Sequence, residues 1–286
     1  MTSYRDQQHL SSMSNSQLIS GLEVSRLHQE FLKRRANHQA TLITYITAGD
    51  PDIVTSRAMA LACVEGGADI IELGIPFANP VADGPVIRDA DARALAAGTT
   101  ISDCMSLAFD IRKSADVPVV MMGYFSTFHN IGIKNFMSRC EADAIIVPDL
   151  PAEKVKGFCQ YAQANCINTV FLVTPTASPV RRRMAIAATT GFVYCVATSG
   201  VTGESKEVSP LLSMQVAAVR AETQMPTVIG FGISTGEKAC ALAKLADGVV
   251  IGSAIVRRIA EGGNIRERAK RVREFVGSLR RALDRG

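Results

Sequence analysis

The stretch from residue 227 to residue 254, TVIGFGISTGEKACALAKLADGVVIGSA, is the clearest guide to the architecture of this chain. It holds two apolar, β-branched runs, Thr227–Gly232 and Gly248–Gly252. Both are continuous rather than alternating, as strands are when both faces of their sheet are covered. Between them, Gly236–Leu245 has a helical pattern that follows Ser and Thr residues suited to a helix start. The order of strand, helix and strand predicts a parallel βαβ unit.

The same unit recurs toward the N-terminus. Six further apolar runs predict strands at Leu42–Thr47, Ile70–Gly74, Pro118–Met122, Ala144–Pro148, Thr169–Val173 and Phe192–Ala197. Helical patterns are found at Thr55–Val64, Ile101–Lys113, Lys134–Cys140, Glu153–Asn165, Pro179–Ala188, Pro210–Glu222 and Ile265–Leu283. Two α/β architectures repeat strand and helix in this way, a doubly wound open sheet and a closed (β/α)8 TIM barrel. Eight strands in 286 residues favour the barrel, and no Gly-x-Gly-x-x-Gly motif follows the first strand.

We expect one barrel domain preceded by an extension. Residues 1–23 are rich in Ser and Gln and lack periodicity, which predicts a flexible N-terminal extension. From residue 24 the pattern becomes helical, with Leu27, Phe31 and Leu32 on one face. The sequence therefore predicts an extra N-terminal helix at the start of a catalytic barrel domain that spans residues 24–286.

The composition excludes several classes of protein. A chain with 47% hydrophobic residues and a net charge of +4 is too apolar to be disordered. No apolar stretch reaches the ~18 residues of a membrane span. The first residues lack the apolar centre of a signal peptide, so we expect a cytoplasmic protein that does not bind membranes. Four scattered histidines predict no metal site, and seven cysteines without CxxC spacing are typical of reduced core thiols rather than of disulfides.

The positive charge is concentrated at the C-terminus. Residues 257–286 hold ten of the 31 Lys and Arg residues but only four of the 27 acids. The closing helix places apolar residues on one stripe and its arginines elsewhere, which predicts a solvated outer face. The stripe consists of Ile265, Ala269, Val272, Val276, Leu279 and Leu283. Because the chain has no Trp and no basic stretch interleaved with aromatic residues, nucleic acid is not an expected partner.

The first candidate catalytic group is Glu72, within the apolar run Ile70-Ile71-Glu72-Leu73-Gly74. In a TIM barrel the catalytic groups lie where strands end and βα loops begin. An ionised carboxylate is costly to bury, so we expect Glu72 to have a raised pKa or a charged partner. A raised pKa is what a general acid needs near neutral pH. The alternative is a structural ion pair.

A second candidate carboxylate, Asp83, follows in the long loop after this strand. Three prolines stiffen the loop, and Asp83-Gly84 is typical of a turn. Asp83 is a candidate to face Glu72 across the mouth of the barrel. The alternative, that Asp83 only forms the turn, remains open on spacing alone.

Glycines at the ends of the last two strands predict a phosphate site. Gly232 and Gly252-Ser253 let backbone N–H groups approach an anion. The short helix Ala254–Ile259 adds the positive end of its dipole. The loops after the seventh and eighth strands are the usual phosphate site of this fold, although tight turns alone would also use glycine. The Gly/Ser/Thr-rich loop Thr198–Ser205 predicts a lid in which Gly203 adds another N–H group, or else a plain linker.

Asp149, in Pro148-Asp149-Leu150-Pro151, is typical of a helix cap and is not counted as a catalytic residue. The remaining features together predict a barrel enzyme that acts on a small phosphorylated substrate by carboxylate acid–base chemistry. No metal or organic cofactor is indicated by the sequence.

From residue 24 to the C-terminus the chain resembles the alpha chain of tryptophan synthase. The combination of Glu72 with the segment Ala82–Pro85 is the most specific part of the resemblance. The other matching segments are Ile46–Pro51, Glu72–Phe77, Gly200–Gly203, Gly230–Ser234 and Gly252–Val256. The resemblance implies a lyase that cleaves indole-3-glycerol phosphate to indole and glyceraldehyde 3-phosphate by retro-aldol chemistry.

The resemblance also implies the roles of individual residues. Glu72 matches the acid–base glutamate that protonates indole C3, and Asp83 matches the aspartate that accepts a hydrogen bond from the indole N–H group. The residues that match phosphate-binding positions are Gly203, Gly232, Gly252 and Ser253. The residues that fall in the indole pocket or the lid are Tyr45, Tyr124, Tyr194 and Thr202.

The family's partner is a beta chain in an α2β2 heterotetramer, and the pyridoxal phosphate of that assembly belongs to the beta chain. No cofactor is therefore expected in this chain. Two loops depart from the family pattern. Phe77-Ala78-Asn79-Pro80 stands where the family has Phe-Ser-Asp-Pro, and Ala197-Thr198-Ser199 replaces a run that often carries Arg. The loss of charge at Asn79 weakens the expected communication with a beta chain.

Three alternatives follow from these departures and from the barrel fold. The chain could be a freestanding lyase that releases indole, or a weakly catalytic subunit that activates a beta-type partner. It could also be another phosphate-binding barrel, such as a sugar-phosphate epimerase or an aldolase. The lack of a metal cluster and of a Schiff-base lysine at a strand end argues against this third alternative.

Overall fold

The computed structural model describes residues 25–197, 208–230 and 232–285. A single parallel sheet runs through these residues in the order β5-β4-β3-β2-β1-β9-β8-β7-β6. Its strands are β1 Thr41–Thr47, β2 Ile70–Gly74, β3 Val119–Met122, β4 Ala144–Ile146, β5 Asn168–Val170, β6 Leu172–Val173, β7 Val193–Val196, β8 Thr227–Gly230 and β9 Gly248–Ile251. The first strand pairs with both β2 and β9, so the start and the end of the domain meet at the centre of the sheet.

The two edges of the sheet, β5 and β6, are consecutive in the chain. Only Phe171 separates them, so the sheet curls into a nearly closed barrel. The Phe171 amide donates to the Thr189 hydroxyl at 3.3 Å. The predicted strand Thr169–Val173 therefore consists of two short strands, and the sheet has nine strands rather than the predicted eight. The predicted fold class, a TIM barrel with an extra N-terminal helix, is confirmed.

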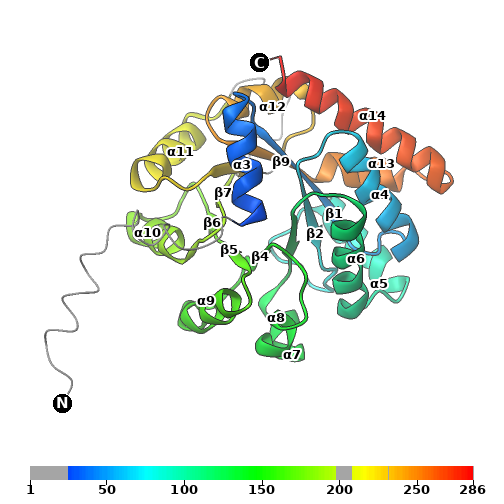
Figure 1. Cartoon of the computed structure of the whole chain (residues 1–286), viewed down its shortest axis with the longest axis horizontal. Coiled ribbons are helices and arrows are strands. Elements are labelled where there is room, and N and C mark those ends of the chain that lie inside the picture. The colour runs from blue at the N-terminus through cyan, green and yellow to red at the C-terminus, as the bar shows by residue number, and fades with distance from the viewer. Residues whose placement is uncertain (1–24, 198–207, 231, 286) are drawn as a thin grey trace, which may run out of the picture.

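Helices surround the sheet, as Figure 1 shows. They are α3 Arg26–Ala36, α4 Ile53–Glu65, α5 Pro85–Ala96, α6 Ile101–Ser114, α7 Phe125–Ile131, α8 Ile133–Met137, α9 Val155–Ala164, α10 Pro179–Ala188, α11 Pro210–Glu222, α12 Gly236–Ala243, α13 Ser253–Ala260 and α14 Ile265–Leu283, with a 3-10 turn at Ala152–Lys154. The helices α5 and α7 were not predicted. Neither has a side-chain cap from its own N-cap residue, Gly84 or Tyr124, and only α5 has a local start signal, the proline at its first position.

The N-terminal helix α3 lies across the amino ends of the strands. Leu27 and Phe31 are buried there, and the Phe31 ring lies 5.7 Å from that of Phe192. The prediction that Leu32 shares their face is wrong, because Leu32 is 55% exposed. A single residue step turns the helix by about 100°, so Leu32 cannot follow Phe31 into the barrel. The predicted extension, residues 1–23, lies outside the described residues.

The closing helix α14 buries most of the predicted stripe, from Val272 to Leu283, although Ile265 is 41% exposed. The prediction that its arginines all lie on a solvated face is wrong at Arg280, which is only 8% exposed. One Arg280 Nη donates to Asp69 Oδ2 at 3.2 Å and to the Ala40 carbonyl at 3.1 Å. The buried Asp69 carboxylate also pairs with Arg34 of α3, so its countercharge comes from both the N-terminal and the closing helix.

Apolar side chains fill two layers, one inside the barrel and one between the strands and the helices. Along β2, Ile70 faces the interior while Ile71 and Leu73 face the helices. This alternation directs Glu72 into the barrel, since strand side chains point to opposite faces in turn. No helix in the part of the chain that the structure describes is long and apolar enough to cross a membrane.

Candidate active site

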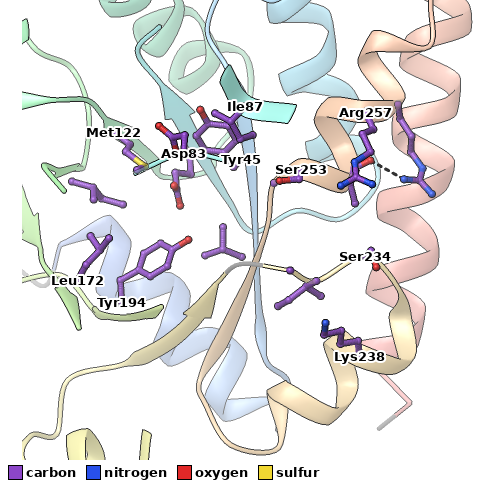
Figure 2. Close-up of a pocket in the computed structure, with 18 residues that line it drawn as sticks. Tyr45, Asp83, Ile87, Met122, Leu172, Tyr194, Ser234, Lys238, Ser253 and Arg257 are labelled. Atoms are coloured by element: carbon purple, nitrogen blue, oxygen red, sulfur yellow. Dashed lines mark hydrogen bonds between the residues drawn. The ribbon is translucent and has the colours of Figure 1, made fainter. Parts of the chain in front are cut away.

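A cavity of about 370 Å³ opens at the carboxyl ends of the strands. Its size is in the range typical of small-molecule sites. Figure 2 shows that the residues around it differ from one end to the other. Asp83, Tyr45 and Ile87 lie toward one end with Met122, Leu172 and Tyr194 nearby, and Ser253, Ser234, Arg257 and Lys238 lie toward the other. The cavity therefore has an end with a carboxylate among apolar and aromatic groups, and a polar end with cationic groups.

Glu72 lies in this cavity at the inward-facing position of β2. It pairs in register with Tyr45 of β1 and Val120 of β3, and it is only 1% exposed. Its Oε2 atom has no hydrogen-bond partner among the described residues. Burial raises the pKa of the Glu72 carboxyl to about 8, and the nearby Asp83 carboxylate adds to the rise. Glu72 can therefore hold a proton at neutral pH.

Asp83 lines the same cavity, and its position is fixed by Tyr124. The Tyr124 hydroxyl donates to Asp83 Oδ2 at 2.7 Å and accepts a hydrogen bond from the Ala82 amide at 2.9 Å. The Tyr124 ring stacks on Phe77, with centroids 4.8 Å apart. Burial raises the pKa of the Asp83 carboxyl, while the hydrogen bond from Tyr124 and the charge of Arg88 oppose the rise. Asp83 therefore does more than form a turn, because Tyr124 holds its carboxylate at the cavity.

Tyr45 and Tyr194, which were also predicted for the indole pocket, both line the cavity, and each ring lies next to a glycine. A Cβ at Gly74 would lie 2.1 Å from the Tyr45 hydroxyl, and a Cβ at Gly230 would lie 2.2 Å from the Tyr194 hydroxyl. Each glycine thus leaves room for the neighbouring ring. Burial is the main cause that raises the pKa of both tyrosines well above the usual value, so both hydroxyls stay neutral. Tyr124 is not itself among the lining residues.

The predicted phosphate positions lie at the polar end. Gly232, with a φ of +70°, lines the cavity together with Gly252 and Ser253. Gly252 is the N-cap residue of α13 and Ser253 is its first residue, so the helix N-terminus faces the cavity. Gly203 and Thr202 lie outside the described residues.

Comparison with known proteins identifies the family. The sequence model of the family described as "Tryptophan synthase alpha chain" matches residues 31–284. The chain belongs to the tryptophan synthase alpha chain family. It is 44% identical over 263 residues to the tryptophan synthase alpha chain of Caldanaerobacter subterraneus, covering 91% of this chain and all of the relative. It is 40% identical over 268 residues to that of Pelobacter propionicus, covering 92% and 99%.

Solved structures of tryptophan synthase share the fold. The alpha subunit from Legionella pneumophila has a TM-score of 0.84 at 32% identity, covering 92% of this chain and 100% of that chain. A chain of Mycobacterium tuberculosis tryptophan synthase gives the same values. Membership of the tryptophan synthase alpha chain family confirms the prediction of a lyase subunit in tryptophan biosynthesis. The freestanding and merely activating alternatives are not favoured.

Four charged residues at or near the cavity were missed by the sequence analysis. Lys238 of α12 and the neighbouring Arg257 and Arg258 of α13 line it. Asp91 lies on the unpredicted helix α5 and is buried. Burial and the charge of Asp83 raise the pKa of the Asp91 carboxyl to about 8. The available signal for Lys238 was its place in the first turn of the helix that follows Gly232, whereas nothing local marked Asp91.

Asp149, predicted to be a cap, does cap a helix, although not the one that follows it. Its Oδ1 accepts a 2.7 Å hydrogen bond from the amide of Phe125, the first residue of α7. Among the residues that the structure describes, no group of three or more His, Cys, Asp or Glu side chains is placed to hold a metal ion.

Proposed function

We propose that this chain cleaves indole-3-glycerol phosphate to indole and glyceraldehyde 3-phosphate. The observation that carries the proposal is the Glu72 carboxyl, buried in β2 with an unpartnered Oε2 atom and a raised pKa. Such a group keeps a proton at neutral pH and can deliver it to a bound substrate as a general acid. The same cavity has apolar and aromatic walls that suit an indole ring and a glycine-rich end that suits a phosphate.

The proposed reaction begins with transfer of the Glu72 proton to indole C3. The ring becomes a cation whose charge is centred on the N1–H group. The Glu72 carboxylate formed in this step then takes the proton of the side-chain hydroxyl next to C3. The C–O bond becomes a carbonyl, the bond from C3 to the side chain breaks, and its electron pair returns to the ring. Neutral indole and the aldehyde leave, and Glu72 is again protonated.

In this mechanism Asp83 accepts a hydrogen bond from the indole N1–H group and stabilises the charge that develops on the ring. The hydrogen bond from Tyr124 supports this role, because it fixes the carboxylate before substrate binds. Tyr45 and Tyr194 contribute apolar ring surface to the indole pocket. Tyr124 acts behind Asp83 as a positioning residue.

We propose that the phosphate binds at Gly232, Gly252 and Ser253, with the N-terminus of α13 directed at it. Gly203 is proposed as a further N–H donor and Thr202 as part of the lid.

The chain is proposed to need no cofactor of its own and to work in an α2β2 assembly with a pyridoxal phosphate-dependent beta chain, in the cytoplasm. Asn79 is exposed in the loop after β2, where it would meet such a partner. Its missing charge is proposed to weaken the response to the beta chain.

Indole release by the purified chain, alone and with a beta chain, tests the function. Replacement of Glu72 by Gln keeps the shape but removes the proton, and we expect at least a ~10²-fold loss of rate. Glu274→Gln, at an exposed position on α14, is the matched control and should leave the rate unchanged. An undiminished rate in Glu72→Gln would exclude Glu72 as the acid.

A further inference from the structure

Three cationic side chains that line the cavity, Lys238, Arg257 and Arg258, have no part in the function proposed above. Arg258 is engaged within the protein, because it stacks on the Phe275 ring and donates to the Ala254 carbonyl at 2.7 Å. Lys238 comes from the first turn of α12, and Arg257 comes from α13. Both line the cavity, and Figure 2 shows them on the same side of it as Ser234 and Ser253. Among the described residues, no carboxylate forms an ion pair with either side chain. Their charges are therefore available to a ligand.

The position of Lys238 is the more informative of the two. Its Nζ atom lies 3.8 Å from the position that a Cβ would take at Gly232, so the ammonium is beside the backbone that faces the cavity. The Lys238 amide donates to the Thr235 hydroxyl at 3.3 Å, and this cap fixes the turn of α12 that carries the side chain. Lys238 is half-buried, so water screens its charge less than that of a fully exposed lysine.

Backbone N–H groups and a helix end offer an anion only partial charges. A phosphate monoester carries close to two negative charges at neutral pH. We infer that Lys238, assisted by Arg257, binds the phosphate group of the substrate through a charge-assisted contact beside Gly232. The inference rests on the proposed function, because it assigns the same cavity end to phosphate. It adds that binding there depends on side-chain charge and selects for dianionic phosphate esters.

The experiment measures binding of inorganic phosphate and of glycerol 3-phosphate to the full chain by isothermal titration. Lys238→Gln should weaken binding of both by about fivefold, as expected for a partly screened ionic contact. Lys238→Arg keeps the charge and should retain most of the affinity. Lys244→Gln, at an exposed position after α12, removes the same charge outside the cavity and should bind like the unmodified chain.

Salt gives a second readout. Binding to the unmodified chain should weaken with NaCl more steeply than binding to Lys238→Gln, since screening acts on the charge that the variant lacks. In the indole-release assay Lys238→Gln should raise KM and leave kcat nearly unchanged. Equal affinity and equal salt dependence in the two proteins, or no phosphate binding by the unmodified chain, would overturn the inference. Phosphate binding that depends on Lys238 without any indole release would instead overturn the proposed function alone.

Discussion

The hydroxyl of Tyr124 holds the carboxylate of Asp83 at 2.7 Å across 41 residues of sequence. Tyr124 precedes α7, and Asp83 lies in the loop after β2. The same hydroxyl accepts a hydrogen bond from the Ala82 amide at 2.9 Å, so one side chain fixes both the backbone and the carboxylate of this loop. The position of Asp83 in the cavity thus depends on a neighbouring βα unit.

Tyr124→Phe removes the hydroxyl while keeping the ring stacked on Phe77. We expect kcat/KM for indole release to fall about tenfold, because a hydrogen bond to a charged group is lost and Asp83 becomes less ordered. Tyr161→Phe, at a partly exposed tyrosine on α9, is the control and should have no effect. An unchanged kcat/KM in Tyr124→Phe would show that Asp83 holds its position without this contact.

The raised pKa of Glu72, about 8, predicts how activity depends on pH. The acid must be protonated to act, so kcat/KM should decline as the pH rises through about 8. A rate profile from pH 6 to pH 10 measures this decline. The residual activity of Glu72→Gln should show no decline in kcat/KM over this pH range. A wild-type profile that stays flat across this range would argue against a protonated Glu72 in the reaction.

The same shift predicts a pH-dependent stability. Between the ordinary glutamate pKa and about 8 the folded chain binds more protons at Glu72 than the unfolded chain does. The free energy of unfolding therefore falls as the pH rises through this window. Glu72→Gln should remove this loss, which is on the order of a few kcal/mol. Urea denaturation of both proteins at pH 5 and pH 9 measures the difference, which should be larger at the higher pH.

Gly74→Ala tests the space that the glycine leaves for Tyr45. The added Cβ would lie 2.1 Å from the Tyr45 hydroxyl, so the ring must move away from its place beside Glu72. We expect a loss of about 1–3 kcal/mol in stability, together with a reduced rate. Gly157→Ala on α9, where nothing lies within 4 Å of the new Cβ, should be neutral or stabilising. Tyr45→Leu combined with Gly74→Ala should cost less than the sum of the two changes.

Arg280→Met tests the buried ion pair under α14. The change removes one of the two arginines that pair with the buried Asp69 carboxylate, while Arg34 of α3 remains. We therefore expect a loss of about 1–3 kcal/mol in the free energy of unfolding. Arg281→Met, on the exposed side of the same helix, should change stability by less than about 0.5 kcal/mol. Similar stabilities of the two variants would show that Arg280 is dispensable.

Asn79→Asp tests the departure in the loop after β2. Restoring the charge should increase the stimulation of indole release on addition of a beta chain and leave the rate of the isolated chain unchanged. The ratio of rates with and without the beta chain is the measurement. Equal ratios for both proteins would show that Asn79 does not weaken the response.

Local signals predicted many of the elements. The helices Pro179–Ala188, Pro210–Glu222 and Ile265–Leu283 have the predicted bounds, because each begins at a Ser-Pro pair or an Asn cap that the sequence itself displays. The helix Phe125–Ile131 was missed, because its cap is the side chain of Asp149, 24 residues further along the chain.

The burial of Glu72 follows from the sequence, since the apolar residues on either side of it place this position of the strand within the barrel. The order of strands and helices was determined in the same way, by hydrophobic periodicity. The tertiary structure alone decided which distant groups meet: Tyr124 with Asp83, Arg280 with Asp69, and Lys238 with Ser253 at the polar end of the cavity. The physical reason is that curling of the sheet sets these contacts. They join residues from different βα units, and no local pattern of side chains records that curvature.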